Sequence, residues 1–113
     1  MKILESPINI TELSELAANY YIDMIKAVAD IDRNLIAIDA ELHSDLESML
    51  LEDGSEQDSL WGFNLYPDIE GEDFIEYDSL INIRPRLGNR SREVENPAIR
   101  KQILEIVNKY IVR

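Results

Sequence analysis

Positive and negative charges are segregated along this chain, and the segregation constrains the fold more than any other feature of the sequence. Residues 34–83 contain no lysine or arginine, while carboxylates recur there from Asp39 to Asp78. The arginine segment that follows, residues 84–92, holds four of the seven arginines and no acid. Soluble surfaces usually mix the two signs. The pattern therefore predicts either that the fold brings the two blocks together or that one block receives a ligand.

Length and composition exclude several kinds of protein. With 113 residues and a hydrophobic content of 45%, the chain is long enough for one core, and we expect a single domain over residues 1–113. A net charge of −12 argues against general binding to nucleic acid or to an anionic membrane surface. The absence of cysteine excludes disulfides and thiolate metal sites. No signal peptide or apolar span is recognisable, so we expect a cytoplasmic protein.

Hydrophobic periodicity in the first half predicts a strand, a long helix and a second strand. Residues 2–5 fit a short strand. Asn9 is a good helix N-cap, and Glu12 stands three residues later as its capping-box partner. Apolar residues then recur at helical spacing, which predicts a helix over residues 10–30. From residue 35 the period changes to two and continues to His43, which predicts a strand with one polar face and an ambiguous end.

The second half predicts a short helix, a hairpin and a last helix. Residues 45–53 lie between a capping box and a glycine and favour a helix, although a strand over 47–52 is the alternative. Alternating patterns at 60–66 and 74–84 flank an acidic turn and predict an antiparallel hairpin. An asparagine cap followed by Pro97 begins the last helix.

These elements predict an α+β two-layer sandwich. Its three- or four-stranded, mainly antiparallel sheet would carry both long helices on one face and leave the other face open to water. The open face would then gather a set of polar side chains, namely Asp39, Glu41, His43, Asp78, Asn82 and Arg84.

The first candidate site is a row of acids around the only histidine. On a strand, Asp39, Glu41 and His43 point to the same face, and Asp45 lies just beyond the strand end. Such a set could hold a divalent ion such as Mn²⁺, Fe²⁺ or Zn²⁺, or Glu41 and His43 could form a catalytic acid–base pair. A metal-assisted hydrolase is therefore one hypothesis, and a solvated strand face is its alternative. No other cofactor is evident.

The second candidate site is the arginine segment. Guanidinium groups present paired donors that suit carboxylate or phosphate, so Arg84, Arg90 and Arg92 are candidate contacts for an anion, with Asn82 and Asn89 orienting it. A small binding module for an anionic small molecule or an acidic peptide is the leading hypothesis. Pairing with the acidic block inside the same molecule is the alternative.

Two further interpretations complete the set. Trp61, near Asn64 on a predicted strand, could form the floor of a small-molecule pocket, although an aromatic residue in a strand usually belongs to the core. The long acidic span also fits an acidic regulatory or inhibitor protein that covers a basic partner.

Several strings in the chain resemble those of a family of short, uncharacterised prokaryotic proteins. They are Glu41–Asp45, Leu51–Asp58, Leu60–Pro67, Ile81–Pro85 and Gly88–Ser91. The resemblance extends over nearly the whole chain, and it implies no assigned activity, cofactor or catalytic residue. Members of the family carry Gly-Gly where this chain has Asp39-Ala40. The resemblance therefore favours Glu41, His43 and Asp45 over Asp39 as site residues.

Overall fold

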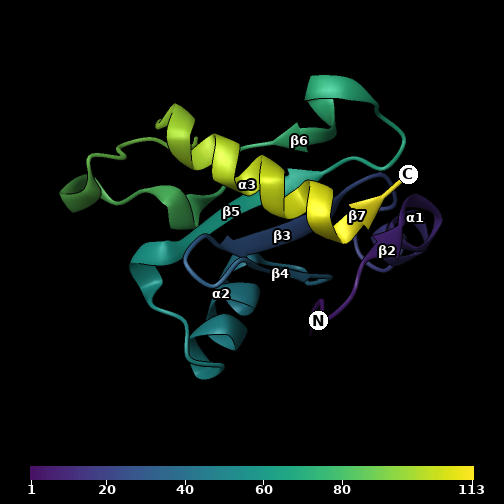
Figure 1. The fold of residues 1–113 in the computed structure, drawn as a ribbon, viewed down its shortest axis with the longest axis horizontal. Helices are drawn as coiled ribbons and strands as arrows, with labels where there is room; N and C mark the ends of the chain where they lie inside the picture. Colours follow the sequence, from purple (N-terminus) through teal and green to yellow (C-terminus); the bar gives the residue numbers. More distant parts are fainter.

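The structure, a computed structural model, describes residues 1–113 and is built around a five-stranded antiparallel sheet with the order β1-β4-β3-β5-β6 (Figure 1). The strands are β1 (Lys2–Ile3), β3 (Ile25–Asp30), β4 (Leu35–Ile38), β5 (Leu60–Leu65) and β6 (Ile75–Glu76). A separate parallel pair joins the start of the chain to its end through β2 (Ile8–Asn9) and β7 (Ile111–Val112).

Three α-helices complete the predicted α+β class, which is confirmed. They are α1 (Ile10–Ala17), α2 (His43–Glu52) and α3 (Pro97–Tyr110), with short 3-10 turns η1 (Gln57–Ser59), η2 (Gly71–Phe74), η3 (Leu80–Asn82) and η4 (Pro85–Leu87). The expected caps of α1 and α3 form, because Asn9 accepts a hydrogen bond from the N–H of Glu12 at 2.8 Å and Asn96 accepts one from Ala98 at 2.9 Å. None of these helices is long and apolar enough to cross a bilayer.

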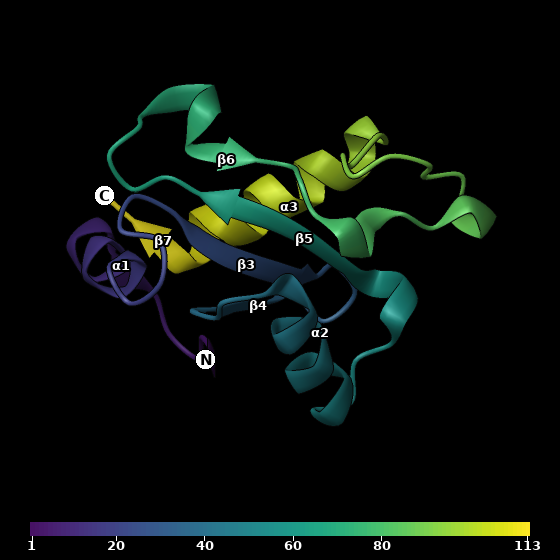
Figure 2. The same cartoon turned by 180° about the vertical axis from the view of Figure 1, so that it is seen from behind.

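Helices cover both faces of the sheet, so the prediction of an open face is wrong. On one face, α1 and α3 pack in a core cluster with Ala27 and Phe63. On the other face, α2 buries Leu46 and Leu50 against Val28 (Figures 1 and 2). The second layer forms because the strands present fully buried apolar residues on both sides.

The predicted helix over residues 10–30 is also wrong, because α1 ends at Ala17 and residues 25–30 form the central strand β3. A strand buried on both faces is a continuous apolar run, and such a run fits a helical pattern as well as a strand pattern. Ala27, Val28 and Ala29 are all fully buried. The chain turns between the two elements with Ile22 at a φ of 69°, a conformation that no glycine or proline announces in the sequence.

The predicted strand 74–84 stops early, because β6 ends at Glu76 and the chain then turns into η3. Beyond that point a side chain takes the place of a neighbouring strand. The Oδ1 atom of Asn82 accepts from the N–H of Gly62 at 2.8 Å, and its Nδ2 atom donates to the Gly62 carbonyl at 2.9 Å. The amide of Asn82 thus satisfies the edge of β5 without a strand ladder.

Gly62 is required where η3 approaches β5, because a Cβ atom there would lie 2.6 Å from Oγ of Ser79. We predict that Gly62→Ala lowers the free energy of unfolding by about 1–3 kcal/mol through overpacking, measured by urea denaturation. The double variant Gly62→Ala/Ser79→Gly should recover part of that loss because it removes the obstructing side chain. A single variant as stable as the native protein would contradict this packing.

Candidate functional site

The fold brings the acidic block and the arginine segment together. Arg84 is buried, and its Nη1 atom donates to the Leu60 carbonyl at 2.6 Å while Nη2 lies 3.1 Å from Oε2 of Glu47. Its guanidinium also lies 5.3 Å from the centre of the Trp61 ring. Burial lowers the pKa of Arg84, and the charge of Glu47 acts against that shift. Arg84 therefore links the arginine segment, residues 84–92, to β5 and α2.

Two more arginines of the segment pair with acids from residues 34–83. Arg86 forms an ion pair with Asp58, and Nε of Arg92 lies 2.7 Å from Oδ1 of Asp78. The guanidinium of Arg90 makes no hydrogen bond, and only its main-chain N–H is bonded, to Glu95 at 3.0 Å. Internal pairing thus accounts for three of the four arginines.

The two asparagines predicted to orient an anion have internal partners instead. Asn82 is fully buried in its bonds to Gly62. Asn89 is also buried, and its Nδ2 atom donates to the carbonyls of Asn82 at 2.8 Å and Glu93 at 2.7 Å. Of the predicted anion contacts, only Arg90 and Arg92 have exposed side chains.

The predicted acid and histidine row does not assemble. His43 is the first residue of α2 rather than part of a strand, and its Nε2 atom lies 2.8 Å from the Phe63 carbonyl. Its side chain is 7% exposed, whereas Glu41 and Asp45 are exposed. No group of three or more His, Cys, Asp or Glu side chains is placed to hold a metal ion. The geometry therefore offers Glu41, His43 and Asp45 no common ligand position.

Burial has a strong effect on His43. Desolvation lowers the pKa of its imidazole to about 4, against an opposing hydrogen bond to the Phe63 carbonyl. The nearby charge of Lys26 lowers the pKa further, and that of Asp78 raises it. The ring is therefore neutral at pH 7 and acts as a donor that ties α2 to β5.

The two remaining predicted residues are buried in the sheet. Trp61 is 2% exposed in the core on the α3 side, and Asn64 is 4% exposed. The Nδ2 atom of Asn64 donates to Oε1 of Glu76 at 2.9 Å, which also accepts from the Tyr66 hydroxyl. Trp61 is thus a core residue, as the alternative interpretation expected, and Asn64 joins β5 to β6.

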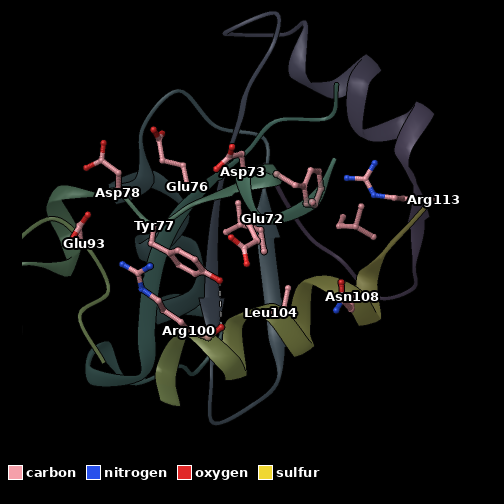
Figure 3. A pocket seen from close by; sticks show the side chains of 14 residues that line it. Glu72, Asp73, Glu76, Tyr77, Asp78, Glu93, Arg100, Leu104, Asn108 and Arg113 are labelled. Carbon is pink, nitrogen blue, oxygen red and sulfur yellow. Dashed lines mark hydrogen bonds between the residues drawn. The ribbon is translucent and has the colours of Figure 1, made fainter. Parts of the chain in front are cut away.

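A cleft of about 930 Å³ lies elsewhere, between residues 71–78 and the flank of α3 (Figure 3). An arginine is stacked on an aromatic ring toward each end of it. The Arg100 guanidinium lies 4.6 Å from the Tyr77 ring centre, and that of Arg113 lies 4.5 Å from the Phe74 ring centre. Between them, α3 contributes Leu104 to the wall of the cleft (Figure 3).

Acids outnumber bases in this cleft. Its lining includes two arginines and five carboxylates, which are Glu72, Asp73, Glu76, Asp78 and Glu93. Both arginines are held by carbonyls, since Nε of Arg100 donates to Val94 at 2.5 Å and Nη2 of Arg113 donates to Ile69 at 3.2 Å. The side chains of Glu72, Asp73 and Glu93 make no hydrogen bond within the molecule. The cleft therefore has a surplus of negative charge and some apolar wall.

The sequence interpretation missed this cleft. The acidic stretch before Phe74 looks like an ordinary solvated turn, and a single exposed leucine on the last helix, Leu104, indicates no site by itself. The one available signal was the density of acids in residues 68–73, next to a strand that proves to be the sheet edge.

Fold and cleft together define a small α+β domain with an acidic cleft beside the edge of its sheet. Residues 2–110 match a family described as "Protein of unknown function (DUF5674)", and the chain belongs to that family. The match agrees with the resemblance to short uncharacterised proteins seen in the sequence. No curated protein and no solved structure matches the chain. The comparisons therefore assign no activity.

We predict that Arg84→Lys lowers the free energy of unfolding by about 1–3 kcal/mol, because one ammonium cannot reproduce the bonds to both Leu60 and Glu47. The matched variant Arg90→Lys removes a guanidinium that makes no hydrogen bond, and it should change the free energy of unfolding by less than about 0.5 kcal/mol. Urea denaturation of the two variants measures the difference. Equal losses would contradict a structural role for Arg84.

The buried histidine predicts a pH dependence of stability. An unfolded histidine takes up a proton near its ordinary pKa of 6.5, but folded His43 does so only near 4. Falling pH between these values therefore favours the unfolded state, by about 3 kcal/mol at most. Urea denaturation between pH 7 and 4 should show a smaller loss for His43→Gln, whose amide can still donate to Phe63. Identical pH profiles would show that His43 titrates normally.

Proposed function

We propose that this protein is a non-enzymatic interaction module that binds a basic polypeptide through the acidic cleft between residues 71–78 and α3. The proposal develops the third sequence hypothesis, an acidic regulatory protein with a basic partner. The surplus of carboxylates in the cleft is the observation that carries it. Opposite charges across an interface speed association and select the partner.

The distribution of ion pairs supports this assignment. Of the arginines that could have balanced the acidic block, Arg84 pairs with Glu47 and Arg86 with Asp58 outside the cleft lining, and Arg92 alone reaches a cleft carboxylate, Asp78. Glu72, Asp73 and Glu93 have no such partner. Glu72 lies between the two arginine–aromatic stacks (Figure 3). A lysine or arginine of a partner would form ion pairs with these carboxylates at little cost in desolvation, because the carboxylates are exposed.

The two other sequence hypotheses have less support. An anion site would need Arg84, Asn82 and Asn89, whose donors are already bonded inside the molecule. A metal-assisted hydrolase would need Glu41 and His43 to face a common position, and His43 instead points to the Phe63 carbonyl.

A charge-matched comparison tests the proposal with a lysine homopeptide as the probe. The cleft variant Glu72→Gln/Asp73→Asn/Glu93→Gln should bind the peptide at least about tenfold more weakly than the native protein, a loss of about 1.4 kcal/mol. The control variant carries the same change in net charge at exposed acids outside the cleft lining, Glu5→Gln/Glu15→Gln/Glu52→Gln.

Fluorescence anisotropy at low and high ionic strength provides the measurement, and salt should weaken the native complex. Equal losses in the two variants would show that binding follows net charge and not the cleft. A native protein that does not bind the peptide at low salt would refute the proposal altogether.

A further inference from the structure

The acidic cleft runs beside an open edge of the sheet. In the strand order β1-β4-β3-β5-β6, β6 has a neighbour on one side only. The edge faces the cleft because Phe74 to Asp78 contribute to the lining opposite α3 (Figure 3). An unpaired edge is a template for another strand. No strand pairs with β6 on that side, where Figures 1 and 2 show the short turn η2 leading into the strand.

Main-chain groups at this edge are free to bind. The N–H of Tyr66 donates to the Phe74 carbonyl at 3.0 Å, which makes that pair a hydrogen-bonded one. Hydrogen-bonded and non-hydrogen-bonded pairs alternate along an antiparallel ladder, so Asn64 and Glu76 form the next hydrogen-bonded pair. Ile75 lies between the two hydrogen-bonded positions of β6, and its N–H and C=O therefore point away from β5. Tyr77 lies just beyond β6, in a tight turn that the N–H of Asp78 closes by bonding to the Glu76 carbonyl at 3.0 Å, and its own main chain makes no hydrogen bond. The edge thus offers the outward donor and acceptor of Ile75 and, just after the strand, the unbonded main-chain groups of Tyr77.

The surroundings determine which side chains an added strand would carry. Successive side chains of a strand point to opposite faces. One set would lie against α3, where Leu104 is 44% exposed next to the rings of Tyr77 and Phe74. The other set would lie on the face of Glu76, where Asp73 also points, whereas Glu72 points toward α3 between the two stacks (Figure 3). Apolar residues suit the first set, and lysine or arginine suits the second.

A second copy of this chain is a poor occupant for the same edge. Antiparallel pairing of two β6 strands would bring Glu76 and Asp78 of each copy close to those of the other, in chains that each carry a net charge of −12. Like charges directly opposite one another destabilise strand pairs. The open stretch is also short, since the N–H of Ser79 is already bonded to the Arg92 carbonyl at 3.0 Å.

From these observations we infer that the partner enters the cleft as an extended segment with alternating basic and apolar residues, and adds to the edge of β6 as a sixth strand. The inference rests on the proposed function and specifies how the partner binds. Main-chain hydrogen bonds to Ile75 and Tyr77 hold the segment, and the carboxylates select its basic residues. With so few paired residues, the contact is weak and reversible.

Three synthetic peptides separate strand addition from simple charge attraction. All alternate lysine with valine, and two of them carry N-methyl groups on the backbone amides of every other residue, which removes the donors of one edge and keeps the charge. Because either edge of the peptide could face β6, methylation is placed on the valines in one version and on the lysines in another. At least one methylated version should bind about tenfold more weakly than the parent.

Hydrogen exchange measured by NMR locates the contact. The amides of Ile75 and Tyr77 should become protected when the parent peptide binds. If both methylated peptides bind as tightly as the parent, or those two amides stay unprotected, strand addition is overturned while binding of basic polypeptides stands. If neither these peptides nor the lysine homopeptide bind, the proposed function itself fails. Protection of both amides in a dimer of the protein alone would assign the edge to a second copy and overturn the inference.

A matched pair of substitutions tests the side-chain part of the inference. Leu104→Lys places a positive charge in the cleft, and Leu80→Lys makes the same change at a leucine that is 67% exposed outside it. Both sites are exposed enough for the fold to survive, which circular dichroism checks. Binding of the parent peptide should weaken about tenfold for the first variant and less than about twofold for the second. Equal effects would contradict insertion beside α3.

Discussion

Buried hydrogen bonds from a few side chains attach the last third of the chain to β5, and much of the molecule depends on them. Asn82 occupies both main-chain groups of Gly62, and Arg84 reaches the Leu60 carbonyl from the same side. Asn89 then holds the following loop through the carbonyls of Asn82 and Glu93. Buried polar groups of this kind are costly when left without a partner. Their mutual satisfaction fixes where the chain enters α3.

This attachment also determines how charge is distributed. Arg84 can bind β5 only if its buried charge is balanced, and Glu47 on α2 provides the balance. Arg86 and Arg92 continue the pattern at the surface with Asp58 and Asp78. Once these arginines are paired, they no longer offset the acids of residues 70–73. The acidic character of the cleft therefore follows from the way the arginine segment folds.

The sequence indicates those parts of the structure that depend on local chemistry. The α3 helix was predictable because Asn96 and Pro97 form a start signal that acts within one turn. The β3 strand was not, because burial on both faces removes the alternation that separates a strand from a helix. The end of β6 was unpredictable for another reason, since the amide of Asn82 replaces a strand only after the fold has brought it to Gly62.

For the candidate sites too, the sequence indicates what depends on local chemistry and does not indicate what depends on the folded arrangement. The sequence correctly separated two charged blocks and offered pairing between them as one outcome, which Arg84, Arg86 and Arg92 confirm. It could not place the cleft, because the acids of the cleft and Leu104 come from segments about thirty residues apart that meet only in the folded protein. It also assigned His43 to a solvent-exposed strand, whereas α2 begins there and buries the ring.

The short edge strand connects fold and proposed function. Natural sheets protect an exposed edge with charged residues, often lysines. Here the charges are carboxylates, Glu76 as the last residue of β6 and Asp78 just after it. Negative charge at the edge disfavours pairing of identical chains just as positive charge would. Protection against self-association therefore does not explain why the charge at this edge is negative. The sign matters for a different chain, because an acidic edge repels acidic strands and attracts basic ones. In the proposed mode of binding, the charge that disfavours pairing of two copies thus also selects the partner.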